Sequence, residues 1–253
     1  MPFLAARFLI GAAAAWVFAI RRPGEVESGV LRAGVLCGVV LCAGYLFQTI
    51  GLQYVSGSVS AFITYLLVLM VPLLSAIVLR RPPTAPTIVG ILLAAVGLYL
   101  LHGAKPTFGK GELLTLGCAF CFAVQIILLA DFAPRYDSFR LNALQLSVVG
   151  VACLIPGFFT GGYDFPLSAW LAAIYTGVAA SAVAFGLMVW AQRRVGPSRT
   201  ALLLMLEPVF AAVGGAIAGD HLGVVGVMGA VLILIGILVA ELRRPPVVTI
   251  PGL

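Results

Sequence analysis

One acidic residue, Glu207, stands inside an apolar stretch and directly before a proline, in the string LLLMLEP at positions 202 to 208. Proline removes a backbone N–H donor and loosens a helix near the carbonyl four residues earlier, which here belongs to Leu204. A carboxylate beside such a break can bind a cation, carry a proton or gate a pathway. A structural acid, held by an arginine or a backbone donor, is the equally open alternative.

Arg7 is the candidate opposite charge, one to two turns into the first apolar stretch. A basic side chain near a helix end usually extends to the interface, so anchoring is one interpretation and contact with an anionic solute or a buried acid is the other. A second proline string, LLVLMVP at 66 to 72, repeats the helix break at Pro72 but has Val71 where Glu207 precedes Pro208. Any acid-dependent chemistry is therefore asymmetric.

Further polar side chains fall within the apolar stretches, where each needs a partner or a cavity. Glutamines are costly to leave facing lipid, so we expect them to point inward, lining a pathway or bonding between helices. Trp190 lies near the end of a stretch, where interfacial anchoring is common. The candidate pathway residues are Glu207, Arg7, Gln48, Tyr65, Gln125, Gln145, Tyr175 and Trp190, and the other polar residues in the stretches are Tyr45, Thr64, Asn142, Thr176 and Ser181.

Signatures of catalysis are absent from the sequence, which has neither HExxH nor a phosphate-binding GxxxxGK[ST] string. His102 and His221 lie at predicted helix ends with nothing metal-like nearby. The cysteines, including the CxxC pair Cys118 and Cys121, lie in apolar runs, which favours packing over redox or metal chemistry. We therefore predict no enzyme, no cofactor and no metal site, with an intramembrane enzyme as a remote alternative.

The elements that position these residues are membrane helices. The chain is 62% hydrophobic and 9% charged, against about 25% charged in a soluble domain, and a spanning helix needs about 20 mostly apolar residues. We predict an all-α polytopic membrane protein with the lipid bilayer as its solvent. Its nine spans are expected at about 3–20, 31–52, 58–79, 86–102, 110–131, 140–159, 167–190, 199–218 and 223–242.

The basic residues report topology, because Lys and Arg are enriched on the cytoplasmic side. Nine spans place Lys105 and Lys110 on one side of the membrane and twelve arginines on the other. Because these arginines stand at helix ends, several of them in pairs, membrane topology explains them, which argues against nucleic-acid binding. We predict an integral protein of the bacterial cytoplasmic (inner) membrane with a cytoplasmic C-terminus and an N-terminus outside. The twelve are Arg21, Arg22, Arg32, Arg80, Arg81, Arg135, Arg140, Arg193, Arg194, Arg199, Arg243 and Arg244.

Each proline string is followed by a helix with two glycines seven residues apart, Gly90 and Gly97 in one copy and Gly229 and Gly236 in the other. Such glycines keep to one helix face and allow close packing, either within one chain or in a homodimer. The chain thus consists of two related halves, which is common in transporters that bind solute between repeats.

These features together resemble the drug/metabolite transporter superfamily, specifically the EamA-like permeases. The resembling strings are ARF at 6–8, GLQYVSGSVSAFITYLLVLMVPLLSAIVLRR at 51–81, GILLAAVGLYLL at 90–101, SRTALLLMLEPVFAAVGG at 198–215, Asp220 and GAVLILIGILVA at 229–240. The resemblance implies two five-helix inverted repeats, ten helices in all. The family's first helix lacks a counterpart ahead of Met1, and Arg80 and Arg81 replace an acid often found after the fourth.

The resemblance implies a first, incomplete repeat of four helices at 1–104, a second repeat of five helices at 105–245, and a cytoplasmic tail at 246–253. The leading functional hypothesis is a secondary transporter of a small organic metabolite or drug-like solute that works by alternating access, with protons as candidate coupling ion and Glu207 as their carrier. The alternative, motivated by the missing helix, is a truncated protein that does not transport, or a partner subunit.

Overall fold

The computed structural model describes residues 1–21, 28–102, 109–217 and 223–242. In these residues the regular secondary structure is helical throughout. The predicted tail at 246–253 lies outside them, as do Arg22, Lys105, Gly219, Asp220, His221, Arg243 and Arg244, and the side chain of His102. The elements are α1 (Pro2–Ile20), α2 (Val30–Gly51), α3 (Gly57–Tyr65), α4 (Leu67–Val78), α5 (Ala85–His102), α6 (Lys110–Phe132), α7 (Ser138–Phe159), α8 (Leu167–Tyr175), the π-helix η1 (Thr176–Ala184), α9 (Phe185–Gln192), α10 (Pro197–Leu204), α11 (Leu206–Ile217) and α12 (Val224–Leu242).

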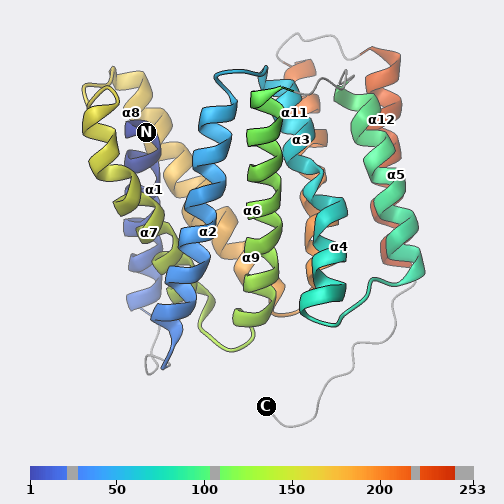
Figure 1. The fold of residues 1–253 in the computed structure, drawn as a ribbon, viewed down its shortest axis with the longest axis horizontal. Coiled ribbons are helices and arrows are strands. Elements are labelled where there is room, and N and C mark those ends of the chain that lie inside the picture. Colours follow the sequence, from blue (N-terminus) through green and yellow to red (C-terminus); the bar gives the residue numbers. More distant parts are fainter. Residues whose placement is uncertain (22–27, 103–108, 218–222, 243–253) are drawn as a thin grey trace.

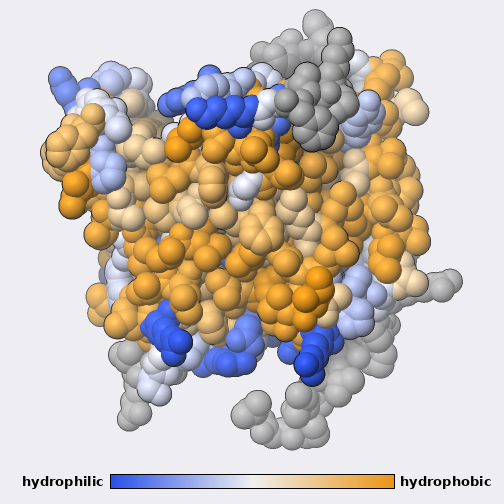
Figure 2. All heavy atoms as spheres, viewed as in Figure 1, coloured by the Kyte–Doolittle hydropathy of each residue, from blue (hydrophilic) through white to orange (hydrophobic). Residues whose placement is uncertain are grey.

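The described helices make nine passages across one slab, confirming the polytopic all-α prediction (Figure 1). Six stretches are long and apolar enough to cross a bilayer, while Ala85–Leu101 and Val224–Ala240 are shorter apolar helices. Figure 2 shows an apolar band with hydrophilic residues at both ends. We call the end that carries Arg21, Arg80, Arg135 and Arg193 the arginine-rich end; the N-terminus lies at the opposite end (Figure 1).

Two of the polar breaks seen in the sequence begin the next helix with a side-chain cap. The Ser56 hydroxyl accepts a hydrogen bond from the Val59 amide (3.4 Å) at the start of α3. The Asp137 carboxylate accepts the amides of Phe139 (3.1 Å) and Arg140 (3.0 Å) at the start of α7. Both caps satisfy amides that the first turn of a helix cannot pair internally, so the break residues fix where these passages begin.

Three passages depart from the uniform helices that apolar length predicts. The third passage is interrupted at Leu66, between α3 and α4, and the eighth at Met205, between α10 and α11. At both interruptions the amide bonds three residues back rather than four, from Leu66 to the Ile63 carbonyl (3.1 Å) and from Met205 to the Leu202 carbonyl (3.0 Å). The seventh passage contains η1 in its middle. Breaks of this kind mark functional sites in many membrane helices.

The seven-residue glycine pairs pack against each other, with α5 antiparallel to α12. A Cβ on Gly97 would lie 2.6 Å from the Gly229 carbonyl oxygen, and one on Gly236 would lie 2.5 Å from that of Gly90. Glycine is therefore required for this approach of the two backbones. The two glycine faces are thus used within one chain, and a homodimer stays a prediction.

The apolar core lies in three groups. The smallest joins α2, α6, α7 and α9 around Leu129 and Val189, and two larger groups flank the centre of the molecule. One group joins α1, α2, α7 and η1 through residues such as Phe8, Leu41 and Leu146. The other joins α4, α5, α6, α10 and α12 through residues such as Val68 and Ile233. Helices α2 and α6 pack side by side between these groups, so their polar residues face elements from both halves.

Candidate functional site

Glu207 lies in the first turn of α11, directly after the break at Met205. It is ten residues into the eighth passage, which places it about 15 Å from the start of α10 and near the middle of a 30 Å hydrocarbon layer. Its side chain is exposed, not buried as expected of an acid within a span. A carboxylate at this depth would cost several kcal/mol if it faced lipid, which favours contact with water or solute.

The partner of Glu207 is Tyr65, the last residue of α3. The phenol hydroxyl lies within hydrogen-bonding reach of the carboxylate, which can only accept from it. Tyr65 directly precedes the break at Leu66 and is half-buried. The acid and its donor therefore come from two different broken passages, and no ion pair joins Glu207 to Arg7 in the described part of the chain.

Tyr45, on α2, stands between the two charged candidates. Its hydroxyl lies within hydrogen-bonding reach of the Arg7 guanidinium and within longer electrostatic reach of Glu207. Its ring makes edge contacts with Phe8 (centroids 4.8 Å apart) and Phe122 (5.3 Å). The tyrosine is therefore held by rings from α1 and α6, while its polar end faces both charges.

Arg7 contacts the second half of the chain and does not extend to the helix end. Its Nε donates to the Ser181 hydroxyl in η1 (3.1 Å). The guanidinium carbon lies 5.3 Å from the Phe8 ring centroid and 5.7 Å from that of Tyr45, within the range of cation–π attraction. Because the side chain is only half-buried, part of its charge stays accessible.

A buried chain of amides supports the site from the second half. Gln125 Nε2 donates to Gln145 Oε1 (3.0 Å), and Gln145 Nε2 donates to Asn142 Oδ1 (2.9 Å). Asn142 Nδ2 then donates to the Ala182 carbonyl in η1 (3.1 Å). Gln125 and Gln145 are 2% and 0% exposed, so they point inward as expected. They bond α6 to α7 and to η1, next to Ser181.

The remaining sequence candidates are not brought into this group. Gln48 is half-buried on α2, three residues after Tyr45. Tyr175 is 73% exposed at the end of α8, and Trp190 is 43% exposed on α9. The Arg194 guanidinium lies 4.5 Å from the Trp190 ring centroid, near the arginine-rich end, as in an interfacial anchor. Pro72 and Pro208 are buried on α4 and α11, beyond the breaks of their passages.

Tyr45, Asn142 and Ser181 belong to the site although the sequence marked them only as polar residues within spans. Nothing in their local strings sets them apart. Ser60 and Thr64 are buried one turn apart on α3, and the Ser60 hydroxyl finds no hydrogen-bond partner among the described residues. The polar face of α3 thus extends from Ser60 to Tyr65, next to Glu207.

The group as a whole offers a cationic end at Arg7, an anionic end at Glu207 and phenol hydroxyls between them. Such an arrangement can bind a polar solute through charge-assisted hydrogen bonds. A carboxylate paired with a hydroxyl, and not with a cation, can also take up and release a proton. The residues come from α1, α2, α3, η1 and α11, which are elements of both halves.

Comparison with known proteins establishes the family. The family model described as "EamA-like transporter family" matches residues 1–103 and 109–242. The chain belongs to the EamA-like transporter family. This membership supports a membrane transporter, integral to the membrane, and points away from an enzyme.

The relatives agree with this family. An uncharacterized transporter of Archaeoglobus fulgidus is 30% identical over 84% of this chain and 69% of its own length. The uncharacterized transporter YyaM of Bacillus subtilis is 26% identical over 93% of this chain and 82% of its own. A solved crystal structure at 22% identity covers 95% of this chain and 87% of its own, with a TM-score of 0.84, which supports the fold.

Proposed function

We propose that this protein is a secondary transporter that moves a small organic solute across a cytoplasmic membrane by alternating access. The observation that carries the proposal is the meeting of Glu207 and Tyr65 from two interrupted passages. Interrupted helices near the middle of the bilayer form the solute and ion sites of many transporters. The EamA-like membership and the transporters among the relatives support the same class.

In the proposed mechanism the two repeats, residues 1–104 and 105–245, rotate relative to each other about the group formed by Arg7, Tyr45, Tyr65 and Glu207. The proline strings support an inverted relation between the repeats, because α4 and α11 run in opposite directions (Figure 1). The solute binds between Arg7 and Glu207 in this scheme, and the amide chain from Gln125 to Ala182 holds η1 in place. The arginine-rich end faces the cytoplasm, in keeping with the usual distribution of basic residues.

Protons are the proposed coupling ion, with Glu207 as their carrier. The carboxylate is exposed, lies near mid-membrane and has the neutral Tyr65 hydroxyl within hydrogen-bonding reach. Protonation would remove a charge from the solute site, so solute binding and proton binding would be linked at one side chain. Opening to the two sides in turn would then couple a proton gradient to solute movement.

The test is flux of a solute panel in proteoliposomes, with and without a pH gradient. Wild-type protein should move at least one solute class faster with the gradient. In Glu207→Gln the increase in flux caused by the gradient should be at least about tenfold smaller. Asp131→Asn is the matched acid-to-amide control, because Asp131 forms an exposed ion pair with Arg135 (2.6 Å) at the arginine-rich end. No flux of any solute with wild-type protein contradicts transport, whereas unchanged gradient dependence in Glu207→Gln contradicts the proton role.

A further inference from the structure

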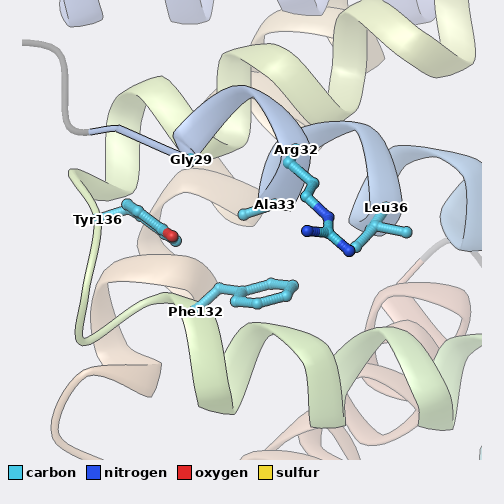
Figure 3. Close-up of a pocket in the computed structure, with 6 residues that line it drawn as sticks. All are labelled: Gly29, Arg32, Ala33, Leu36, Phe132 and Tyr136. Atoms are coloured by element: carbon cyan, nitrogen blue, oxygen red, sulfur yellow. The ribbon is translucent and has the colours of Figure 1, made fainter.

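A hollow of about 320 Å³ lies at the arginine-rich end, apart from the site described above. Figure 3 shows it between the start of α2 and the end of α6, with the Arg32, Leu36 and Phe132 side chains along it and Tyr136 at one end. Gly29 and Ala33 complete the lining. The volume lies at the lower limit of small-ligand sites and suits a phosphate-sized head group.

The lining combines one cation, one phenol hydroxyl and apolar walls. Arg32 is exposed and forms no ion pair with any residue that the structure describes. The neighbouring acid, Asp131, is paired with Arg135, and Asp137 accepts the first amides of α7. Among the residues that the structure describes, the uncompensated charge at the hollow is therefore positive. A guanidinium fork matches the geometry of a phosphate group.

The surface next to the hollow is apolar and exposed. Leu36 and Val39 follow Arg32 at helical spacing on the same side of α2 and are 43% and 54% exposed. Because α2 runs from the arginine-rich end toward the opposite end (Figure 1), this stripe leads from the guanidinium into the apolar band. A ligand with a phosphate and acyl chains would use both parts, whereas free phosphate would leave the stripe unused.

We propose that this hollow binds the phosphate of an anionic phospholipid, with Arg32 as its charged ligand and the lipid's acyl chains lying along Leu36 and Val39. Tyr136 adds a hydroxyl at the other end of the hollow. A Cβ on Gly29 would lie 2.8 Å from the Tyr136 hydroxyl oxygen, so glycine at this position keeps the loop close without displacing that group. Basic pockets between membrane helices bind anionic head groups in this manner.

The test is native mass spectrometry of the full chain with phosphatidylglycerol or phosphatidylcholine added at equal concentration. Wild-type protein should retain phosphatidylglycerol in preference to phosphatidylcholine, and Arg32→Gln should lower the bound fraction of phosphatidylglycerol about fivefold. Arg193→Gln is the matched control, because Arg193 is exposed at the same end but outside the hollow. Equal loss in both variants, or equal retention of the two lipids by wild-type protein, overturns the proposal.

Two further arms separate a lipid from a soluble phosphate and a ligand from a structural residue. Glycerol 3-phosphate and inorganic phosphate should not displace phosphatidylglycerol at tenfold excess; displacement assigns the hollow to a soluble phosphate and overturns the lipid proposal. If Arg32→Gln does not fold, Arg32→Lys keeps the charge without the fork and should bind phosphatidylglycerol more weakly than wild type. Unchanged retention in Arg32→Lys contradicts recognition by the guanidinium.

Discussion

The two interrupted passages, α3 with α4 and α10 with α11, share a break and a proline but present different residues to their surroundings. In the first passage Val71 precedes Pro72 and is 0% exposed. In the second Glu207 precedes Pro208 and is exposed. The same local architecture thus serves packing in one copy and places an accessible charge in the other.

The difference teaches that the two copies contribute complementary parts. The first copy supplies a hydroxyl at its break, on Tyr65, and the second supplies the carboxylate within reach of that hydroxyl. Helix α4 also packs against α10, so the break of one copy lies beside the other. A site built from both copies changes when the copies move relative to each other, which is what alternating access requires.

The largest effect, on the stability of the folded protein, should follow from placing an acid directly before the proline of the first copy. Val71→Glu would bury a charge among apolar side chains of α4 and α5, where Val68 and Leu98 belong to the same core group. An unpaired buried charge costs several kcal/mol, so we expect a large loss of folded protein in fluorescence-detected size-exclusion chromatography after heating. Glu207→Val, the reverse exchange at an exposed position, should change stability by less than about 0.5 kcal/mol. Similar melting of the two variants would contradict the asymmetry.

An intermediate effect should follow from removing the hydroxyl that the first copy donates. Tyr65→Phe keeps the ring but removes the hydroxyl that lies within reach of Glu207 and helps to orient its carboxylate toward solute. We expect gradient-driven flux in proteoliposomes to fall about tenfold with little change in unfolding. Tyr54→Phe is the control, because the Tyr54 hydroxyl binds Lys110 (3.2 Å) at an exposed position. Equal losses of flux in both variants would show that the phenol at 65 has no special role.

Much of the fold could be predicted because a bilayer demands helices of fixed length. The caps at Ser56 and Asp137 begin helices at Gly57 and Ser138, within two residues of the span starts expected at 58 and 140. The proline at 208 also predicted a weakened helix near Leu204, one residue from the observed break at Met205. Helix length, proline and capping act locally, so one string is enough to recognise them.

The assembly of the site could not be predicted in the same way. A helix that is apolar on all sides gives no periodic signal for the face that turns inward. Tyr65 and Tyr175 therefore looked equivalent, although one contacts Glu207 and the other lies on an exposed face. The π-helix η1, whose Ser181 and Ala182 bind Arg7 and Asn142, depends on partners from distant helices and has no local signature.

The smallest effect on flux and stability should come from replacing Tyr175, which lies outside the site. Tyr175 shares an exposed side of its passage with Leu171 (57% exposed) and Val178 (39%), a surface suited to lipid. Tyr175→Leu should leave flux unchanged and alter stability by no more than about 0.5 kcal/mol. Tyr45→Leu, the same substitution at a tyrosine of the site, should lower flux at least about tenfold because Arg7 loses the hydroxyl next to it. If Tyr175→Leu reduced flux as strongly, the solute path would run along this outer face, and the meeting of the two interrupted passages would no longer define it.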